Sequence, residues 1–328
     1  MAFLLTAEQR EFARSLDALL TAADTPAVLR AWAAGDRGPG LALWRRLARA
    51  GVFALAVPEG YGGLGPLPVE AVVAGVELGR HAVPGPVAET LAAGVLLGAA
   101  GGPVAGEWLA GIASGGAVVS LALAGHGPFA LDADVADAVF TVAGDGLRLA
   151  PGPGAGSPST DPARRLFRPE PGGEVLAAGA GVREAARAAG DWASLATAAQ
   201  ALGCGEALLR ATVAYVKRRT QFGVPVGSFQ AVKHRLADTL LGLEFARPLV
   251  YGAAVELAAG APGAGASVAA AKVAAGEAGY AAALTALRLH GAVGYTEELE
   301  LAWWLRRARP LRDAWGSPSA CRARVLAG

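Results

Sequence analysis

The segment from Lys217 to Asp238, KRRTQFGVPVGSFQAVKHRLAD, holds the side chains best suited to bind a charged group. It joins an arginine-rich helix end to a Phe-Gly turn and to a second helix that begins at Phe229. Arg219 offers a planar cationic fork that suits a phosphate better than a lysine would, and Gln230 adds a neutral donor and acceptor. By themselves, these residues also allow a helix-loop-helix corner with solvated arginines.

Other glycine-containing segments decide between these two interpretations. They read PEGYGGLG at residues 58–65, VELGRHAVPGPVAETL at 76–91 and LHGAVGYTEELELAWWLRRAR at 289–309. Together with the segment around Arg219, and in this order, they resemble the acyl-CoA dehydrogenase family over nearly the whole chain. A lone HGxxG would be weak support, whereas separated motifs in one order are hard to obtain by chance.

The resemblance implies a mainly α fold with a small β domain. It consists of an N-terminal helical domain, a middle β-barrel-like domain and a C-terminal four-helix bundle. The resemblance also implies FAD as the cofactor, an acyl-CoA substrate, electron-transfer flavoprotein as the electron acceptor, and a flavin site shared by two subunits of a dimer or tetramer. The residues that match the FAD-contacting positions are Arg219, Gln221, Phe222, Gly223, Gln230, Arg288 and Gly291.

Within this set, the loop of Arg219 matches the one that meets the FAD of a neighbouring subunit. The turn from Leu289 to Gly291 matches the segment near the adenine-side phosphates, although Arg288 stands where the family usually has Gln. Arginine keeps a donor that can bind phosphate. His290 titrates near neutral pH, but the resemblance implies a structural role for it.

The dehydrogenation implied by the family needs a carboxylate base. It removes the proton alpha to the thioester while the beta hydrogen leaves as hydride to the flavin. Many members place this Glu directly before a Gly-Thr or Gly-Ser pair, where the present chain has Trp315. Others place it at the start of the first C-terminal helix, where Asp191 is the nearest acid. Asp191 is also typical of a helix N-cap, so the sequence yields no firm catalytic residue.

The middle segment departs from the family pattern as well. Where the family has Thr-Glu-Pro-Gly-Ala-Gly-Ser, residues 122–128 read ALAGHGP, which offers fewer donors to a flavin ring. We therefore favour a subunit without its own base that pairs with a catalytic homologue. The alternatives are a self-sufficient homo-oligomer that uses Asp191 or another acid, and a non-redox structural or binding homologue.

Composition excludes several other classes of protein. The 328 residues carry 29 Lys and Arg against 28 Asp and Glu, so no general charge attracts nucleic acid. Cys204 and Cys321 lie in no metal-binding or disulfide pattern, which favours a reducing, cytoplasmic setting. The uncharged stretch from Trp108 to Gly125 is interrupted by Gly115-Gly116. It therefore predicts a short helix, a turn and a strand rather than a membrane span.

Three domains must position these residues: an N-terminal helical domain at 1–115, a shortened middle β domain at 116–178 and a C-terminal helical domain at 179–328. Thr6 and Gln9 predict a capping box, and Asp145-Gly146 predicts a hairpin. Residues 151–162 predict an exposed loop. The later helices are expected at Asp191–Arg218, Phe229–Ala259 and Ala264–Leu289, followed by a broken segment from Glu297.

Overall fold

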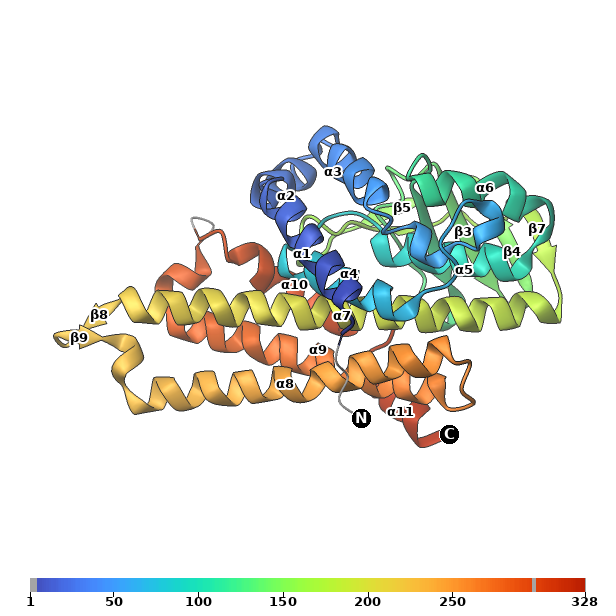
Figure 1. The fold of residues 1–328 in the computed structure, drawn as a ribbon. Helices are drawn as coiled ribbons and strands as arrows, with labels where there is room; N and C mark the ends of the chain where they lie inside the picture. Colours follow the sequence, from blue (N-terminus) through green and yellow to red (C-terminus); the bar gives the residue numbers. More distant parts are fainter. Residues whose placement is uncertain (1–4, 297–298, 328) are drawn as a thin grey trace.

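The computed structural model describes residues 5–296 and 299–327. Its N-terminal part is helical, and Thr6 begins the first helix with the predicted capping box, because Thr6 and Gln9 each accept the other's backbone N–H. Figure 1 shows these helices above the long C-terminal ones. They are α1 (Ala7–Thr21), α2 (Thr25–Ala33), α3 (Gly38–Arg49), α4 (Pro68–Arg80), α5 (Val87–Ala100) and α6 (Gly102–Ser114).

The uncharged stretch 108–125 folds as predicted. Helix α6 ends at Ser114, Gly115 takes a left-handed conformation with φ of 70°, and the first strand begins at Val119. Glycine suits this turn because it adopts positive φ without a steric penalty. No described helix is both long enough and apolar enough to cross a lipid bilayer.

Residues 119–178 form two small open sheets, with strand orders β1-β3-β4-β7 and β2-β6-β5. The β3–β4 hairpin is confirmed, with Ala143 paired to Gly146. The predicted barrel-like closure is wrong, because strands this few and this short cannot curve into a closed barrel. The strands are β1 (Val119–Leu123), β2 (Ala130–Leu131), β3 (Ala138–Ala143), β4 (Gly146–Leu149), β5 (Ala155–Ser157), β6 (Leu166–Arg168) and β7 (Glu174–Ala178).

Two of the three predicted later helices agree closely with the structure, and the first is longer than predicted. It spans 39 residues because apolar residues at helical spacing continue upstream of Asp191, where Val182, Ala185 and Ala189 are buried. The final segment is broken as expected, although its predicted start at Glu297 lies outside the described residues. The elements are α7 (Ala180–Arg218), β8 (Thr220–Gln221), β9 (Val224–Pro225), α8 (Gln230–Ala258), α9 (Ala264–His290), α10 (Ala302–Asp313) and α11 (Pro318–Ala327).

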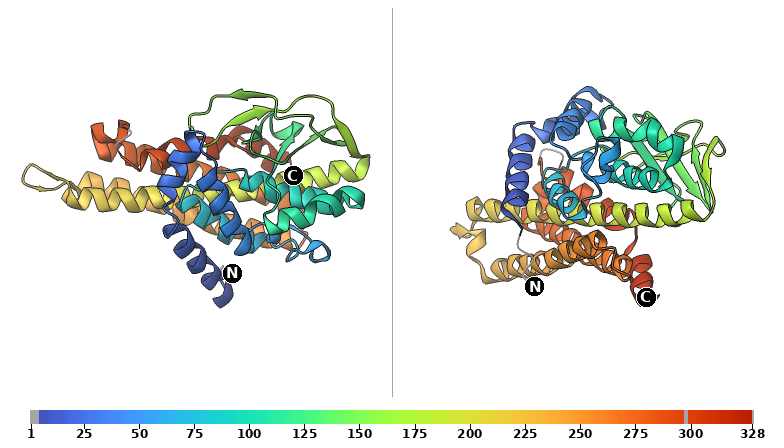
Figure 2. Two further views of the ribbon diagram at one scale, coloured as in Figure 1. Left: turned by 90° about the horizontal axis from the view of Figure 1, so that it is seen from above. Right: turned by 45° about the vertical axis from the view of Figure 1, so that its right-hand side comes forward.

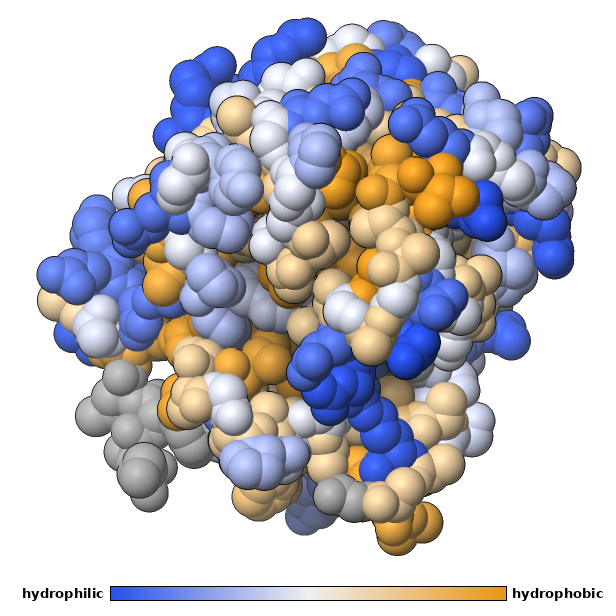
Figure 3. All heavy atoms as spheres, turned by 90° about the vertical axis from the view of Figure 1, so that its right-hand side faces the viewer, coloured by the Kyte–Doolittle hydropathy of each residue, from blue (hydrophilic) through white to orange (hydrophobic). Residues whose placement is uncertain are grey.

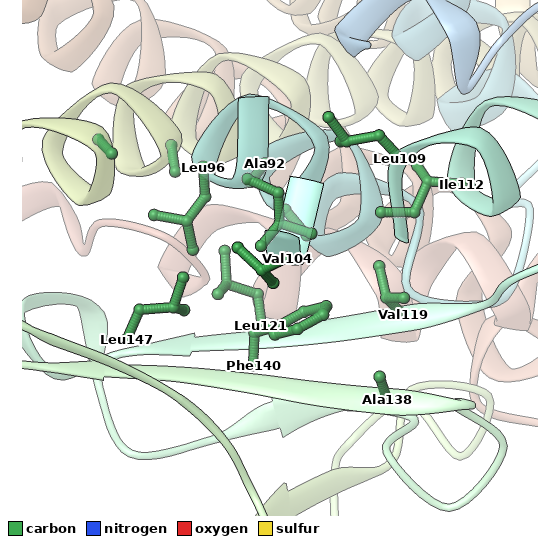
Figure 4. Close-up of a cluster of buried hydrophobic side chains, with 14 of the residues drawn as sticks. Ala92, Leu96, Val104, Leu109, Ile112, Val119, Leu121, Ala138, Phe140 and Leu147 are labelled. Carbon is green, nitrogen blue, oxygen red and sulfur yellow. The ribbon is translucent and has the colours of Figure 1, made fainter. Parts of the chain in front are cut away.

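Helix α7 organises the core, since it packs against α4, α5, α9 and α10. Two glycines permit the close approach of α4 and α7. A Cβ on Gly79 would lie 2.1 Å from the Gln200 carbonyl oxygen, and one on Gly203 would lie 1.9 Å from that of Val76. A second core lies between α5, α6 and the larger sheet, where Leu96 and Ile112 of the helices and Phe140 of the sheet belong to one cluster (Figure 4).

The two ends of the molecule differ. In the views of Figures 1 and 2, the hairpin of β8 and β9 extends beyond the helices at one end. Figure 3 shows the opposite end, where hydrophilic and hydrophobic residues are mixed over a rounded surface.

Candidate functional site

The β8–β9 hairpin presents the Phe-Gly turn in an unusual conformation. Gln221 pairs with Val224, so the loop has two residues, and both have positive φ: 51° at Phe222 and 80° at Gly223. Positive φ at both positions defines a type I′ turn, in which Asn-Gly is the favoured pair. Phenylalanine in this conformation costs about 1–2 kcal/mol. Its ring is 93% exposed, so burial within this chain does not offset that cost.

Cations gather at the same end. Five exposed cationic side chains form no ion pair with any described residue: Lys217, Arg218, Arg219, Lys233 and Arg235. Unpaired guanidinium and ammonium groups at the surface are suited to bind phosphate oxygens. Gln221 and Gln230 are exposed beside them.

The end of α9 lies beside this hairpin region. Tyr215, one turn before Arg219, stacks on His290 with ring centroids 4.2 Å apart. His290 is buried, and its Nδ1 donates to the Ala286 carbonyl at 2.8 Å, as expected for a structural histidine. Arg288 and Gly291 flank it and are exposed. The structure thus places the seven candidate FAD-contacting residues at one end of the molecule.

Trp315 lies far from that end, in the break between α10 and α11. Its φ is 57°, and only 7% of the residue is exposed. The indole Nε1 donates to Glu89 Oε1 at 2.8 Å, and its carbonyl accepts from Ser194 Oγ at 2.6 Å. An indole N–H is only a donor, so the Trp315 side chain has no group that could accept a proton from carbon.

Asp191 does not cap a helix, contrary to one of the two predicted roles. Because α7 begins at Ala180, Asp191 lies three turns inside it, is buried, and forms an ion pair with Arg324 on α11 at 2.5 Å. Its other predicted role, as a catalytic acid, gains no support from this geometry.

Trp315 and the altered segment 122–128 come together in space. The His126 ring lies 5.4 Å from the Trp315 ring, between centroids, and both residues line a chamber of about 460 Å³. Leu123, Phe129 and Leu131 give it apolar walls. Trp315 and segment 122–128, which lie far apart in the sequence and both depart from the family pattern, therefore line one site.

Sequence reasoning missed two charged residues of this chamber, Glu89 and Arg164. Glu89 is 3% exposed and Arg164 is 6% exposed. Burial lowers the pKa of Arg164, and the nearby charge of Glu89 opposes that shift. The only sequence signal for Glu89 was a single acid in the otherwise uncharged run Val87–Ala100, while nothing distinguished Arg164 from its neighbour Arg165.

Residues 151–162, predicted to form an exposed loop, are exposed or half-buried except at Asp161, and Ser159 and Thr160 line the chamber. Asp161 is fully buried and pairs with Arg307 of α10. Arg307 also donates to the carbonyls of Ala82 and Val83 at 2.9 Å each. Asp161 is the exception because a polar, glycine-rich segment can still bury one carboxylate when a distant arginine supplies its partner.

Family comparisons match both helical parts of the chain. The N-terminal domain of acyl-CoA dehydrogenases matches residues 6–116, and the C-terminal domain matches residues 179–326. Acyl-CoA dehydrogenase IpdE2 of Mycobacterium tuberculosis is 36% identical, over 95% of this chain and 94% of that protein. Its namesake in Mycolicibacterium smegmatis is 32% identical, over 95% and 96% of the two chains.

Solved structures show the same architecture. A chain of the ChsE4-ChsE5 complex from Mycobacterium tuberculosis aligns with a TM-score of 0.82 and 26% identity, over 100% of this chain and 98% of that chain. Butyryl-CoA dehydrogenase from Megasphaera elsdenii gives a TM-score of 0.82 at 23% identity, over 100% and 99% of the two chains. At that lower identity the likeness concerns the fold alone.

Proposed function

Because the chain belongs to the acyl-CoA dehydrogenase family of FAD-dependent oxidoreductases, we propose that it is a subunit that helps to bind FAD but lacks a catalytic carboxylate of its own. A homologous subunit supplies the base, and the pair dehydrogenates an acyl-CoA thioester between its α and β carbons. Electron-transfer flavoprotein is the proposed acceptor. The observation that carries the proposal is the buried, doubly held Trp315 at the position of the family's base.

The hairpin end fits an FAD diphosphate. Its cations, Arg219 among them, are exposed, form no ion pair with a described residue, and can donate hydrogen bonds to the phosphate oxygens of another molecule. Arg288 and the Gly291 turn lie at the same end of the helices, where a second phosphate contact is possible. Bound FAD supplies the hydride acceptor. The residues of this chain hold the cofactor's polar half in place.

The turn residue Phe222 supports contact with a partner. The Phe222 ring is almost fully exposed on a backbone that disfavours a bulky side chain, and within its own chain it has one edge-on aromatic contact, with Phe229. Exposed aromatic anchors contribute strongly at interfaces, where a partner's pocket removes them from water. The hairpin therefore suits insertion beside the flavin of a neighbouring subunit.

Helix α8 adds an apolar surface that a partner could cover. Leu241, Phe245 and Leu249 recur every fourth residue and are 52, 71 and 47% exposed. Residues spaced by four lie on one face of a helix, so these side chains form a stripe. Exposed apolar stripes of this kind commonly mark subunit interfaces, which supports an oligomer.

The test is to produce the chain alone and together with a catalytic homologue encoded by the same organism. We expect flavin retention and turnover only from the pair, with this chain co-purifying. A homo-oligomer of this chain that holds a full complement of flavin and oxidises acyl-CoA would overturn the proposal. In that preparation, the Asp191→Asn variant would show whether Asp191 is the base, since it would abolish bleaching of the flavin by substrate.

A further inference from the structure

We propose that a groove along the C-terminal part of α7 is a binding site for an elongated organic carboxylate, whose charged end lies between Arg210 and Arg218. The groove has a volume of about 770 Å³ and is lined by residues of α1, α2, α4, α7 and α10 and of the segment just before α10. Among the described residues, it shares no lining residue with the chamber around Trp315. The inference does not rest on the pairing proposed above.

The floor of the groove is a face of α7 that consists largely of alanine. Ala207, Ala211 and Ala214 line it, together with Arg210 and Arg218. From Ala207 to Arg218 the floor extends about 16 Å along the helix axis. Because an alanine side chain ends at Cβ, this face leaves free space above the backbone. A ligand that lies along α7 must therefore be elongated.

Two arginines flank Ala214 on this floor. Arg210, Ala214 and Arg218 recur every fourth residue, so they lie on one face of the helix. Both arginines are exposed, and neither side chain forms an ion pair or a hydrogen bond with a described residue. The small side chain between them leaves room for both guanidinium groups to contact one anion. A carboxylate suits this arrangement, because each of its two oxygens accepts charge-assisted hydrogen bonds.

Most other charged side chains of the groove already have partners of opposite charge within the chain. The pairs are Arg80 with Glu77 and Glu206, His81 with Asp17, and Glu300 with Arg30. Asp24 also lines the groove, and its carboxylate accepts the Ala27 backbone N–H at the start of α2. The two unpaired arginines outweigh this single acid, so the charge balance selects an anion.

The groove also offers apolar surface. Leu20 and Pro26 come from α1 and α2, and Leu301 and Trp304 come from the start of α10. The indole Nε1 of Trp304 donates to the Arg80 carbonyl at 2.8 Å, so the polar atom of this side chain is already engaged. Sites for small organic molecules combine apolar side chains with a few polar groups that fix orientation. This lining therefore selects an apolar body behind the carboxylate.

Four probes test the inference on the purified chain: biphenyl-4-carboxylate, biphenyl-4-carboxamide, biphenyl-4-carboxamidinium and benzoate. Saturation-transfer NMR ranks their affinities. We expect biphenyl-4-carboxylate to bind at least about tenfold more tightly than the other three, because the amide lacks the charge, the amidinium is repelled by the arginines and benzoate lacks half of the apolar body. An excess of FAD should leave the carboxylate bound. Absence of carboxylate binding, equal or tighter binding of another probe, or displacement by FAD would overturn the inference.

Substitutions on α7 locate the bound carboxylate. Arg210→Gln and Arg218→Gln should each lower its affinity about tenfold, because each removes a charge-assisted donor. Ala214→Leu should abolish binding by filling the space between the arginines, and leucine preserves the helix. Lys217→Gln is the matched control: it removes an exposed charge at the same helix end, outside the groove lining, and should leave the affinity unchanged. Equal losses in Lys217→Gln and Arg218→Gln, or full binding by Ala214→Leu, would contradict the proposal.

Discussion

The hairpin end and the chamber differ in whether their charged and aromatic side chains are exposed or buried, and in whether these side chains have partners within the chain. At the hairpin end, Arg219 is exposed and unpaired, and Phe222 lies almost entirely in solvent. Around the chamber, Trp315 is buried and hydrogen-bonded, and Asp191 nearby is ion-paired. Exposed charged and aromatic groups without a partner in the chain are available to bind another molecule, whereas buried groups with partners hold the fold together. The contrast supports a subunit that contributes to a shared site without carrying out deprotonation itself.

The largest effect is expected from Arg219→Met at the hairpin end. Loss of a charge-assisted hydrogen bond costs about 1.5–3 kcal/mol, so flavin affinity of the assembled pair should fall roughly 10- to 150-fold. Titration of the flavin-free pair with FAD measures this change. Lys217→Met removes the same charge two residues away and should have a much smaller effect. If both variants lost FAD affinity equally, the positive charge of the hairpin end as a whole would account for binding, and no specific contact of Arg219 would be needed.

Trp315→Phe tests the chamber side of the comparison. The change leaves Glu89 Oε1 without its indole donor, which should lower the free energy of unfolding by about 1–3 kcal/mol. Flavin retention by the pair should not change. Trp108→Phe is the matched control, because the indole nitrogen of Trp108 has no hydrogen-bond partner among the described residues. Denaturant unfolding followed by circular dichroism distinguishes the two variants.

Asp132, behind the chamber, should make stability depend on pH. Burial raises its pKa to about 8, above the ordinary value of 3.8, so the folded state holds a proton that the unfolded state releases between these values. The contribution of Asp132 to the free energy of unfolding is therefore greatest at low pH. It decreases as pH rises toward 8, by up to about 1.4 kcal/mol per pH unit. Asp132→Asn should flatten this decline between pH 5 and 8 in urea titrations. An unchanged slope would show that Asp132 is ionised in the folded protein.

The smallest effect is expected from Phe222→Asn, and it should have opposite signs for stability and assembly. Asparagine suits a type I′ turn, so the isolated chain should gain up to about 1 kcal/mol of stability. Association with the partner should weaken, because the exposed ring is lost. Phe222→Ala is the control: it should weaken association without stabilising the chain. Unchanged association in both variants would remove Phe222 from the proposed interface.

Much of the fold could be predicted from the sequence, because its signals are local. The capping box at Thr6, the turn at Gly115 and the β3–β4 hairpin depend on residues close together in the chain, and all three are confirmed. The family resemblance was likewise carried by contiguous motifs and is confirmed by the matches to both helical domains. The division into three domains at the predicted boundaries, and the FAD contacts, stay predictions.

Tertiary structure decided the environment of each acid. The sequence by itself determined that Trp315 stands where the family has its base, and that an Arg-rich Phe-Gly loop is retained. Only the fold revealed that Asp191 faces Arg324, that Asp161 is buried against Arg307, and that Glu89 meets the Trp315 indole. These pairs join residues more than a hundred positions apart. No local pattern encodes them, because burial and charge partners arise only when distant helices pack together.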